Sequence, residues 1–104
     1  MTRKYEMVYI LSPTLVEDQL EAAHARVQEI VAANAEVDSV EDWGRRRLAY
    51  EIDDQREGSY AVITFRAGTE APREIDRLVK LQTGLLRHLI VRLDEKFVPE
   101  TDKE

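Results

Sequence analysis

The most distinctive motif of this sequence is a run of three arginines, Arg45, Arg46 and Arg47, which could form a binding surface for an anionic ligand. Guanidinium groups pair well with phosphate oxygens, so such a run is typical of a surface that contacts a nucleic-acid backbone. On a strand, Arg45 and Arg47 would point to one face and Arg46 to the other. Two other interpretations stay open. The arginines could pair with carboxylates such as Asp42 and Glu51 and guard a strand edge, or that edge could accept a strand from another protein.

Other patterns for catalysis or metal binding are weak. The chain has no cysteine, which excludes disulfides, thiolate metal sites and cysteine nucleophiles. His24 and His88 have no partner at ligand spacing, so we expect two ordinary surface or edge histidines and no metal site. Adjacent carboxylates are expected to be solvated, and the four glycines form no phosphate-binding loop. We therefore predict neither an enzyme nor a cofactor.

The charges of the chain are unevenly distributed. Its 104 residues include 15 Lys and Arg against 21 Asp and Glu, a net charge of −6 that by itself disfavours nucleic acid. Charges beyond roughly 8–10 Å are screened at cellular salt, so the local distribution decides what happens at contact. Arginines gather at 45–47, near the N-terminus and at Arg87 and Arg92. We expect a basic face on an acidic protein, which binds beside a partner rather than strongly alone.

The strands and helices that carry these residues can be predicted from the spacing of apolar residues along the chain. Alternation predicts strands over 4–11, 36–52, 60–66 and 86–93, with a bulge near Trp43 and a polar hairpin loop over 53–58. Spacings of three and four predict helices over 16–34 and from a cap at Thr69 to a stop at Thr83 and Gly84. In the first strand, Tyr5, Met7, Tyr9 and Leu11 alternate with Glu6, Val8 and Ile10. The first helix would carry an apolar stripe of Leu20, Ala23, Val27, Ile30 and Val31, and the second a buried stripe of Ile75, Leu78, Val79 and Gln82.

This order of elements predicts an α+β, ferredoxin-like βαββαβ fold. Its four-stranded antiparallel sheet would carry two helices on one face and leave the other face available, with the first strand central and the second at an edge. Residues 1–97 would form one domain and 98–104 a short acidic disordered tail. No segment has the roughly 18 uninterrupted apolar residues of a membrane span, and no signal peptide is evident. We expect a soluble, cytoplasmic protein.

The residues around the arginine run resemble a known family. Segment 44–52 (GRRRLAYEI) is similar to the signature of the bacterial small-subunit ribosomal protein S-six (S6) family: glycine, any residue, two polar or basic positions, Leu-Ala-Tyr, any residue, Ile. Segment 3–6 (RKYE) looks like the family's opening, and 85–91 (LLRHLIV) is similar to its last strand. The resemblance covers about residues 3–98 and departs at His88, where an arginine is common.

The resemblance implies a structural role in the small ribosomal subunit. Members bind the central domain of small-subunit ribosomal RNA together with ribosomal protein S-eighteen (S18), a small basic partner whose charge would complement the acidity here. The expected RNA contacts are Arg3, Lys4, Arg45, Arg46, Arg47, Arg87 and Arg92. The expected partner contacts are Trp43, Arg47 and Glu51. Leu48, Tyr50 and Ile52 would serve the core and strand geometry. The alternative is a non-enzymatic ferredoxin-like module that dimerises through an edge strand.

Overall fold

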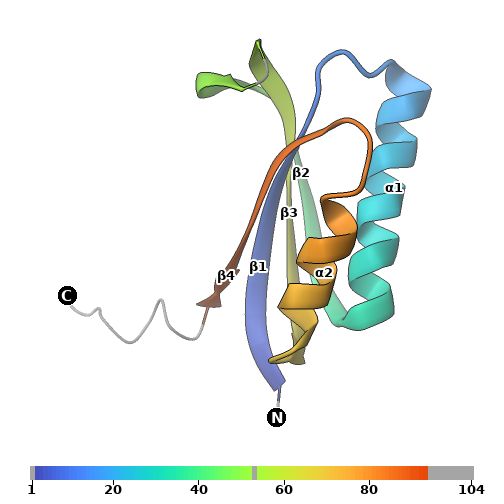
Figure 1. Ribbon diagram of the computed structural model, residues 1–104, viewed down its shortest axis with the longest axis vertical. Helices are drawn as coiled ribbons and strands as arrows, with labels where there is room; N and C mark the ends of the chain where they lie inside the picture. The colour runs from blue at the N-terminus through green and yellow to red at the C-terminus, as the bar shows by residue number, and fades with distance from the viewer. Residues whose placement is uncertain (1, 53, 94–104) are drawn as a thin grey trace, which may run out of the picture.

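The computed structural model describes residues 2–52 and 54–93 and shows the predicted order of elements (Figure 1). The elements are β1 (Thr2–Leu11), α1 (Glu17–Asn34), β2 (Glu36–Ile52), β3 (Gln55–Gly68), α2 (Ala71–Val79) and β4 (Leu85–Arg92). The strands form one antiparallel sheet in the order β2-β3-β1-β4. Both helices cover the same face of this sheet (Figure 1). The predicted ferredoxin-like α+β fold is confirmed, with β1 central and β2 at an edge.

The core lies between the sheet and the two helices. Alternate residues of β1 face the helices, and the register places Tyr5 opposite Phe65 and Met7 opposite Ile63 on β3. Each fully buried side chain of this kind contributes on the order of 1.5–3 kcal/mol relative to its exposed state. The buried cluster consists of Tyr5, Met7, Tyr9, Leu11, Val27, Val31, Ala61, Ile63, Phe65, Ala67, Ile75 and Val79. The predicted stripes therefore form the core, except at the end of α2.

The second helix is shorter than its sequence pattern suggested. α2 ends at Val79, because the amides of Leu81 and Gln82 bond three residues back and tighten the chain into a turn. Gln82 therefore lies beyond the helix and not on its buried stripe. The predicted cap at Thr69 is also wrong, since the N-cap position belongs to Glu70, which makes no side-chain cap bond.

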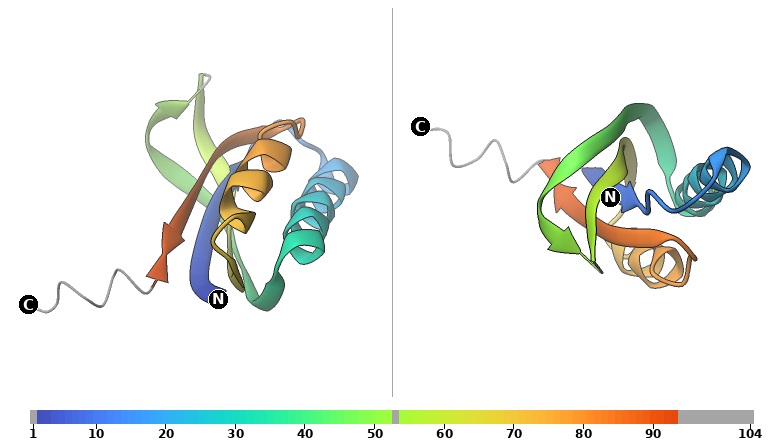
Figure 2. Two further views of the ribbon diagram at one scale, coloured as in Figure 1. Left: turned by 60° about the horizontal axis from the view of Figure 1, so that its bottom comes forward. Right: turned by 90° about the horizontal axis from the view of Figure 1, so that it is seen from above.

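The β2–β3 hairpin is longer than predicted and reaches past the rest of the sheet. β3 begins at Gln55 rather than at residue 60, because Gln55 pairs with Ile52 and little of the expected loop is left. The predicted bulge is confirmed by a register shift between Asp42 and Gly44, where Gly44 has φ +75°. Residues 45–52 and 54–57 form the hairpin tip, which curls away from the helices on the side of the open sheet face (Figure 2).

Candidate nucleic-acid interface

The three arginines of the run lie on β2 at the start of the hairpin tip, and the register separates their faces. Arg45 pairs with Ser59, whose other neighbour is the core residue Leu11, so Arg45 lies on the helix side of the sheet. Arg46 pairs with Gly58 and lies on the opposite side. The predicted alternation of the run is therefore present in the structure.

These arginines differ in how far they are neutralised. Arg45 Nη1 lies 3.7 Å from a carboxylate oxygen of Glu57, and its Nη2 donates to the carbonyl of Pro13 at 3.4 Å. Arg46 lies over the ring of Trp43, 5.8 Å from its centroid, and donates to the Trp43 carbonyl at 3.2 Å. The side chain of Arg47 is exposed and makes no hydrogen bond or ion pair with any residue that the structure describes. The positive charge of Arg46 and Arg47 therefore faces solvent without a carboxylate partner.

The carboxylates that could have neutralised the run are engaged elsewhere. Asp42 accepts a hydrogen bond from the amide of Gly44 at 2.9 Å. Glu41 accepts one from Trp43 Nε1 at 3.0 Å, and Glu51 pairs with Arg56 at 2.9 Å. Among the described residues, Asp42, Glu41 and Glu51 therefore do not pair with the run, and pairing with a carboxylate holds for Arg45, through Glu57, but not for Arg46 or Arg47.

Arg87 of β4 joins the same end of the molecule through Tyr50. The guanidinium of Arg87 lies over the Tyr50 ring, 5.7 Å from its centroid, and Nη1 donates to the Tyr50 hydroxyl. Tyr50 is 59% exposed, so its expected place in the core is wrong, whereas Leu48 is buried at 7%. Tyr50 shares the face of β2 that carries Arg46, and the helices do not cover this face of the sheet (Figure 2). We call Arg45, Arg46, Arg47 and Arg87 the tip cluster.

The other predicted RNA contacts gather at the opposite end of β1. Arg3 lies two residues before Tyr5, and Arg92 lies opposite Tyr5, so Arg3 and Arg92 are diagonal neighbours on the helix face. Lys4 is exposed on the open face, opposite Arg66. Arg66 is neutralised by Asp38 at 2.8 Å and by Glu36, and its hydrogen bonds hold the pKa of the Asp38 carboxyl below its usual value.

Sequence reasoning missed Arg73, which the fold adds to this end. Arg73 lies in the first turn of α2 and lines a groove together with Arg92. Nothing in the local sequence distinguishes it from the other charged residues of α2, since only the packing of α2 against the sheet places it there. We call Arg3, Lys4, Arg73 and Arg92 the basal cluster.

The seven predicted RNA-contact residues therefore do not form one patch. Arg92 lies opposite Tyr5 near the start of β1, and Arg87 lies opposite Ile10 near its end. The N-terminus and the hairpin tip lie at opposite ends of the molecule (Figure 1). A ten-residue strand such as β1 spans about 33 Å. A contact that involves both clusters has to extend along the whole sheet.

The three predicted partner contacts follow one another along β2, the edge strand of the sheet. Trp43 is 45% exposed at the bulge, Arg47 follows it without a carboxylate partner, and Glu51 is exposed and bridged to Arg56. β2 has a paired neighbour only on the β3 side, so its other edge presents backbone N–H and C=O groups. The three residues thus share an edge that a protein partner could contact.

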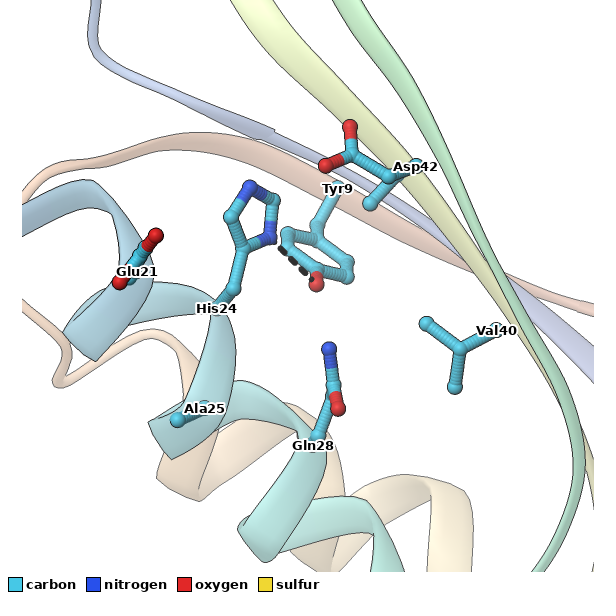
Figure 3. A pocket seen from close by; sticks show the side chains of 8 residues that line it. Tyr9, Glu21, His24, Ala25, Gln28, Val40 and Asp42 are labelled. Carbon is cyan, nitrogen blue, oxygen red and sulfur yellow. Dashed lines mark hydrogen bonds between the residues drawn. The ribbon is translucent and has the colours of Figure 1, made fainter. Parts of the chain in front are cut away.

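The two histidines are partly buried and hydrogen-bonded. His88 lies on the edge strand β4, within the expectation of surface or edge histidines, whereas His24 packs against the sheet. His24 Nδ1 is hydrogen-bonded to the Tyr9 hydroxyl at 2.9 Å, beside a hollow of about 330 Å³ between α1 and β2 (Figure 3). Burial raises the pKa of Tyr9 to about 12, so its hydroxyl stays neutral at physiological pH; Asp42 adds to this effect and Gln28 opposes it. His88 Nε2 donates to Asp76 at 2.6 Å, which ties β4 to α2.

The described residues contain no cluster of three or more His, Asp or Glu that could hold a metal ion. The helices in the described ranges are also too short or too polar to span a bilayer. Arginines with unneutralised charge are thus the chemically distinctive groups of this surface.

Comparison with known proteins identifies a family with the same fold. The family model described as ribosomal protein S6 matches residues 4–92. The crystal structure of the 30S ribosomal protein S6 from Thermotoga maritima is similar to the chain, with 31% identity and a TM-score of 0.84. The match covers 92% of this chain and 94% of that one. A dimeric ferredoxin-like protein of unknown function from Thermobifida fusca is more distant, with 15% identity and a TM-score of 0.46. That match covers 88% of this chain and 89% of that one.

Proposed function

The chain belongs to the ribosomal protein S6 family of the small ribosomal subunit, and we propose that it binds the central domain of small-subunit ribosomal RNA together with S18. In this proposal it is a structural component of the cytoplasmic ribosome. It acts through phosphate contacts and shape, without a cofactor or a reaction of its own. The family match over residues 4–92 is the observation that carries the proposal.

The charges of the tip cluster support an RNA role for this end of the molecule. The chain as a whole is acidic, with a net charge of −6. Arg46, Arg47 and Arg87 nevertheless lack carboxylate partners among the described residues, and aromatic rings support two of them. Arginines held over a ring keep their outer N–H groups available to phosphate oxygens. Neutralising phosphates with such groups releases counterions, which makes binding depend on salt.

The free edge of β2 supports the proposed protein partner. A basic protein is attracted by an acidic chain at long range, and exposed aromatic side chains often anchor protein interfaces. Trp43 and Tyr50 are exposed aromatic residues of this strand, and Glu51 adds a carboxylate. In the proposal, Arg47 lies where the RNA and the partner meet.

The test is a triple substitution of Arg45, Arg46 and Arg47 to alanine. Binding to a central-domain RNA fragment is measured across a salt series, with and without S18. We expect roughly 10- to 100-fold weaker binding and a salt slope smaller in magnitude by about two to three, one for each lost phosphate contact. Unchanged affinity and slope would show that the run does not bind RNA.

A matched control removes three cations that are already neutralised. Arg26, Arg77 and Lys80 pair with carboxylates of their own helices at 4.0, 2.6 and 3.4 Å. Replacing these three by alanine changes the net charge as much as the triple substitution in the run does. We expect this control to bind RNA nearly as the wild type does.

The partner contact has its own test. Trp43→Ala should weaken RNA binding more strongly when S18 is present than when S18 is absent, because it removes the partner contact in addition to the ring beneath Arg46. A stable homodimer in sedimentation, lost on Trp43→Ala, would favour the edge-strand dimerisation module instead.

A further inference from the structure

A groove runs between α2 and β4 at the basal end of the molecule. Tyr5, Arg73, Asp76, His88 and Arg92 are among its lining residues, and its volume is about 580 Å³. Figure 2 shows α2 alongside β4 on the helix face of the sheet. The groove is thus built from the start of α2 and the end of β4, two segments that are distant from the arginine run.

The ion pairs of α2 leave one cation without a carboxylate in this groove. Arg77 binds both oxygens of Glu74, at 3.1 and 2.6 Å. Asp76 receives His88 Nε2 on one oxygen at 2.6 Å and Lys80 on the other at 3.4 Å. The side chain of Arg73 is exposed and makes no hydrogen bond or ion pair within the described residues.

The resulting groove has a positive balance of charge. Asp76 is the only carboxylate among its described lining residues, and His88 and Lys80 already engage it. Arg73 and Arg92 line the same groove, and Arg3 is the diagonal neighbour of Arg92 on this face. The guanidinium group of Arg73, which has no carboxylate partner among the described residues, fits an anion with several oxygens, such as a phosphate diester.

The other lining residues indicate how such a ligand would be recognised. Pro72, Leu89 and Ile90 are apolar, and the charged or ionisable lining side chains are those of Arg73, Asp76, His88 and Arg92. Contact with a backbone phosphate here would depend on charge and shape. A basic protein such as the proposed partner would be repelled from the same groove, so RNA is the occupant that the charges favour.

We propose that the groove between α2 and β4 binds a backbone phosphate of the ribosomal RNA, with Arg73 as its main contact and Arg92 beside it. The inference rests on the proposed function and adds to it a second RNA contact, which lies at the opposite end of the sheet from the tip cluster. A single RNA would then be held at both ends of the protein.

The test compares Arg73→Gln with Arg77→Gln. Both substitutions remove one positive charge from α2, but Arg77 is paired with Glu74 and does not line the groove. We expect Arg73→Gln to weaken binding of the central-domain RNA fragment, with S18 present, about three- to fivefold. The magnitude of the salt slope should fall by roughly 0.7–0.9, the value for one phosphate contact. Arg77→Gln should bind as the wild type does, and Arg73→Lys should keep the wild-type slope.

The possible outcomes separate this inference from the proposed function. If the wild type binds RNA and Arg73→Gln binds equally well with the same slope, the groove does not contact phosphate and the proposed function stands. If Arg77→Gln loses as much affinity as Arg73→Gln, the effect is one of general charge and the inference is wrong. If the wild type binds no central-domain RNA, the proposed function and this inference fail together.

A proximity measurement gives an independent readout. The chain has no cysteine, so one introduced cysteine can carry an iron chelate that cleaves nearby RNA. Glu70→Cys places the chelate at the start of α2, whereas Leu81→Cys places it past the other end of the helix, at an exposed position. We expect discrete RNA cleavage from residue 70 and much weaker cleavage from residue 81. Equal cleavage from both positions, or none from residue 70, would contradict the inference.

Discussion

The tip cluster and the basal cluster are both groups of four cations, but they are built in different ways. Three cations of the tip cluster are consecutive in the sequence and lie on a two-stranded extension that no helix covers (Figure 2). The cations of the basal cluster come from β1, α2 and β4, around the buried residue Tyr5. The tip is held mainly by local contacts, and the basal end is held by the core.

This difference has consequences for how each cluster can bind. A hairpin that extends past the core can move with a partner, since few buried contacts oppose its motion. The backbone positions of the basal cations are fixed relative to one another, because Ile75 and Val79 pack α2 on the sheet. We expect the tip to adapt to its partner and the basal cluster to act as a rigid contact, and the following predictions test that contrast.

The largest expected effect is on stability, and it should differ between the two ends. Ile75→Ala removes a fully buried side chain that seats α2, and we expect a loss of about 3 kcal/mol in the free energy of unfolding. Leu48→Ala removes a side chain of the same size from the tip, where the chain can relax, and should cost about 1–2 kcal/mol. Urea unfolding of both variants measures the difference. Equal losses would show that the tip is part of the same core.

The fold was predictable because its periodicities are strong. The predicted alternation of β1 through Tyr5, Met7 and Tyr9 is present, and the structure shows that this set of side chains faces the core. The predictions of burial were wrong where alternation or helical spacing continues at residues that no other element covers. Tyr50 continues the alternation of Leu48 but is exposed on a face that the helices do not cover. Gln82 continues the spacing of the α2 stripe, but the helix has already ended at Val79.

The candidate site was only partly predictable for a related reason. The arginines from Arg45 to Arg47 are adjacent in the chain, so the amino-acid sequence alone reveals them as a group. Arg73 becomes part of a site only because α2 packs beside β4, which brings it to the same groove as Arg92. The sequence also does not show which carboxylates are already engaged, and ion pairing is what separates Arg73 from Arg77.

Two glycines at the root of the hairpin tip give the next largest effect. A Cβ at Gly58 would lie 2.3 Å from Ile10 Cγ2 and 3.2 Å from the Leu11 carbonyl oxygen, so we expect Gly58→Ala to cost about 2 kcal/mol. Gly44→Ala meets no atom within 4 Å but keeps a positive φ, which should cost about 1 kcal/mol. Chemical denaturation checks both values. Gly68→Ala, which has open space and no positive φ, is the control and should lie within about 0.5 kcal/mol of the wild type.

A smaller effect concerns the link between α2 and β4 at the basal end. The hydrogen bond from His88 lowers the pKa of Asp76 below its usual value. Asp76 therefore contributes stability that is complete above the unfolded pKa and is lost as the pH falls through the folded pKa. The advantage of the wild type over Asp76→Asn should shrink between about pH 5 and pH 2. Its size should stay below about 1 kcal/mol, because the side chain is largely exposed.

The pH prediction is checked by urea unfolding at a series of pH values. His88→Leu removes the donor and should abolish most of the difference between Asp76 and its asparagine variant. A difference that stays constant down to the lowest pH would mean that the Asp76–His88 hydrogen bond does not stabilise the native state.

The smallest expected effect tests whether the tip is held locally. Tyr50→Phe keeps the ring under Arg87 and removes only the hydroxyl that accepts its hydrogen bond. Because both side chains are exposed, the free energy of unfolding should change by less than about 0.5 kcal/mol. Amide hydrogen exchange at Arg46 and Arg47 should nevertheless become faster, since the tip loses a tie to β4, while exchange at Tyr5 in the basal core should not change. Faster exchange at Tyr5 as well would mean that the two ends open together, and the contrast between an adaptable tip and a rigid basal cluster would have to be abandoned.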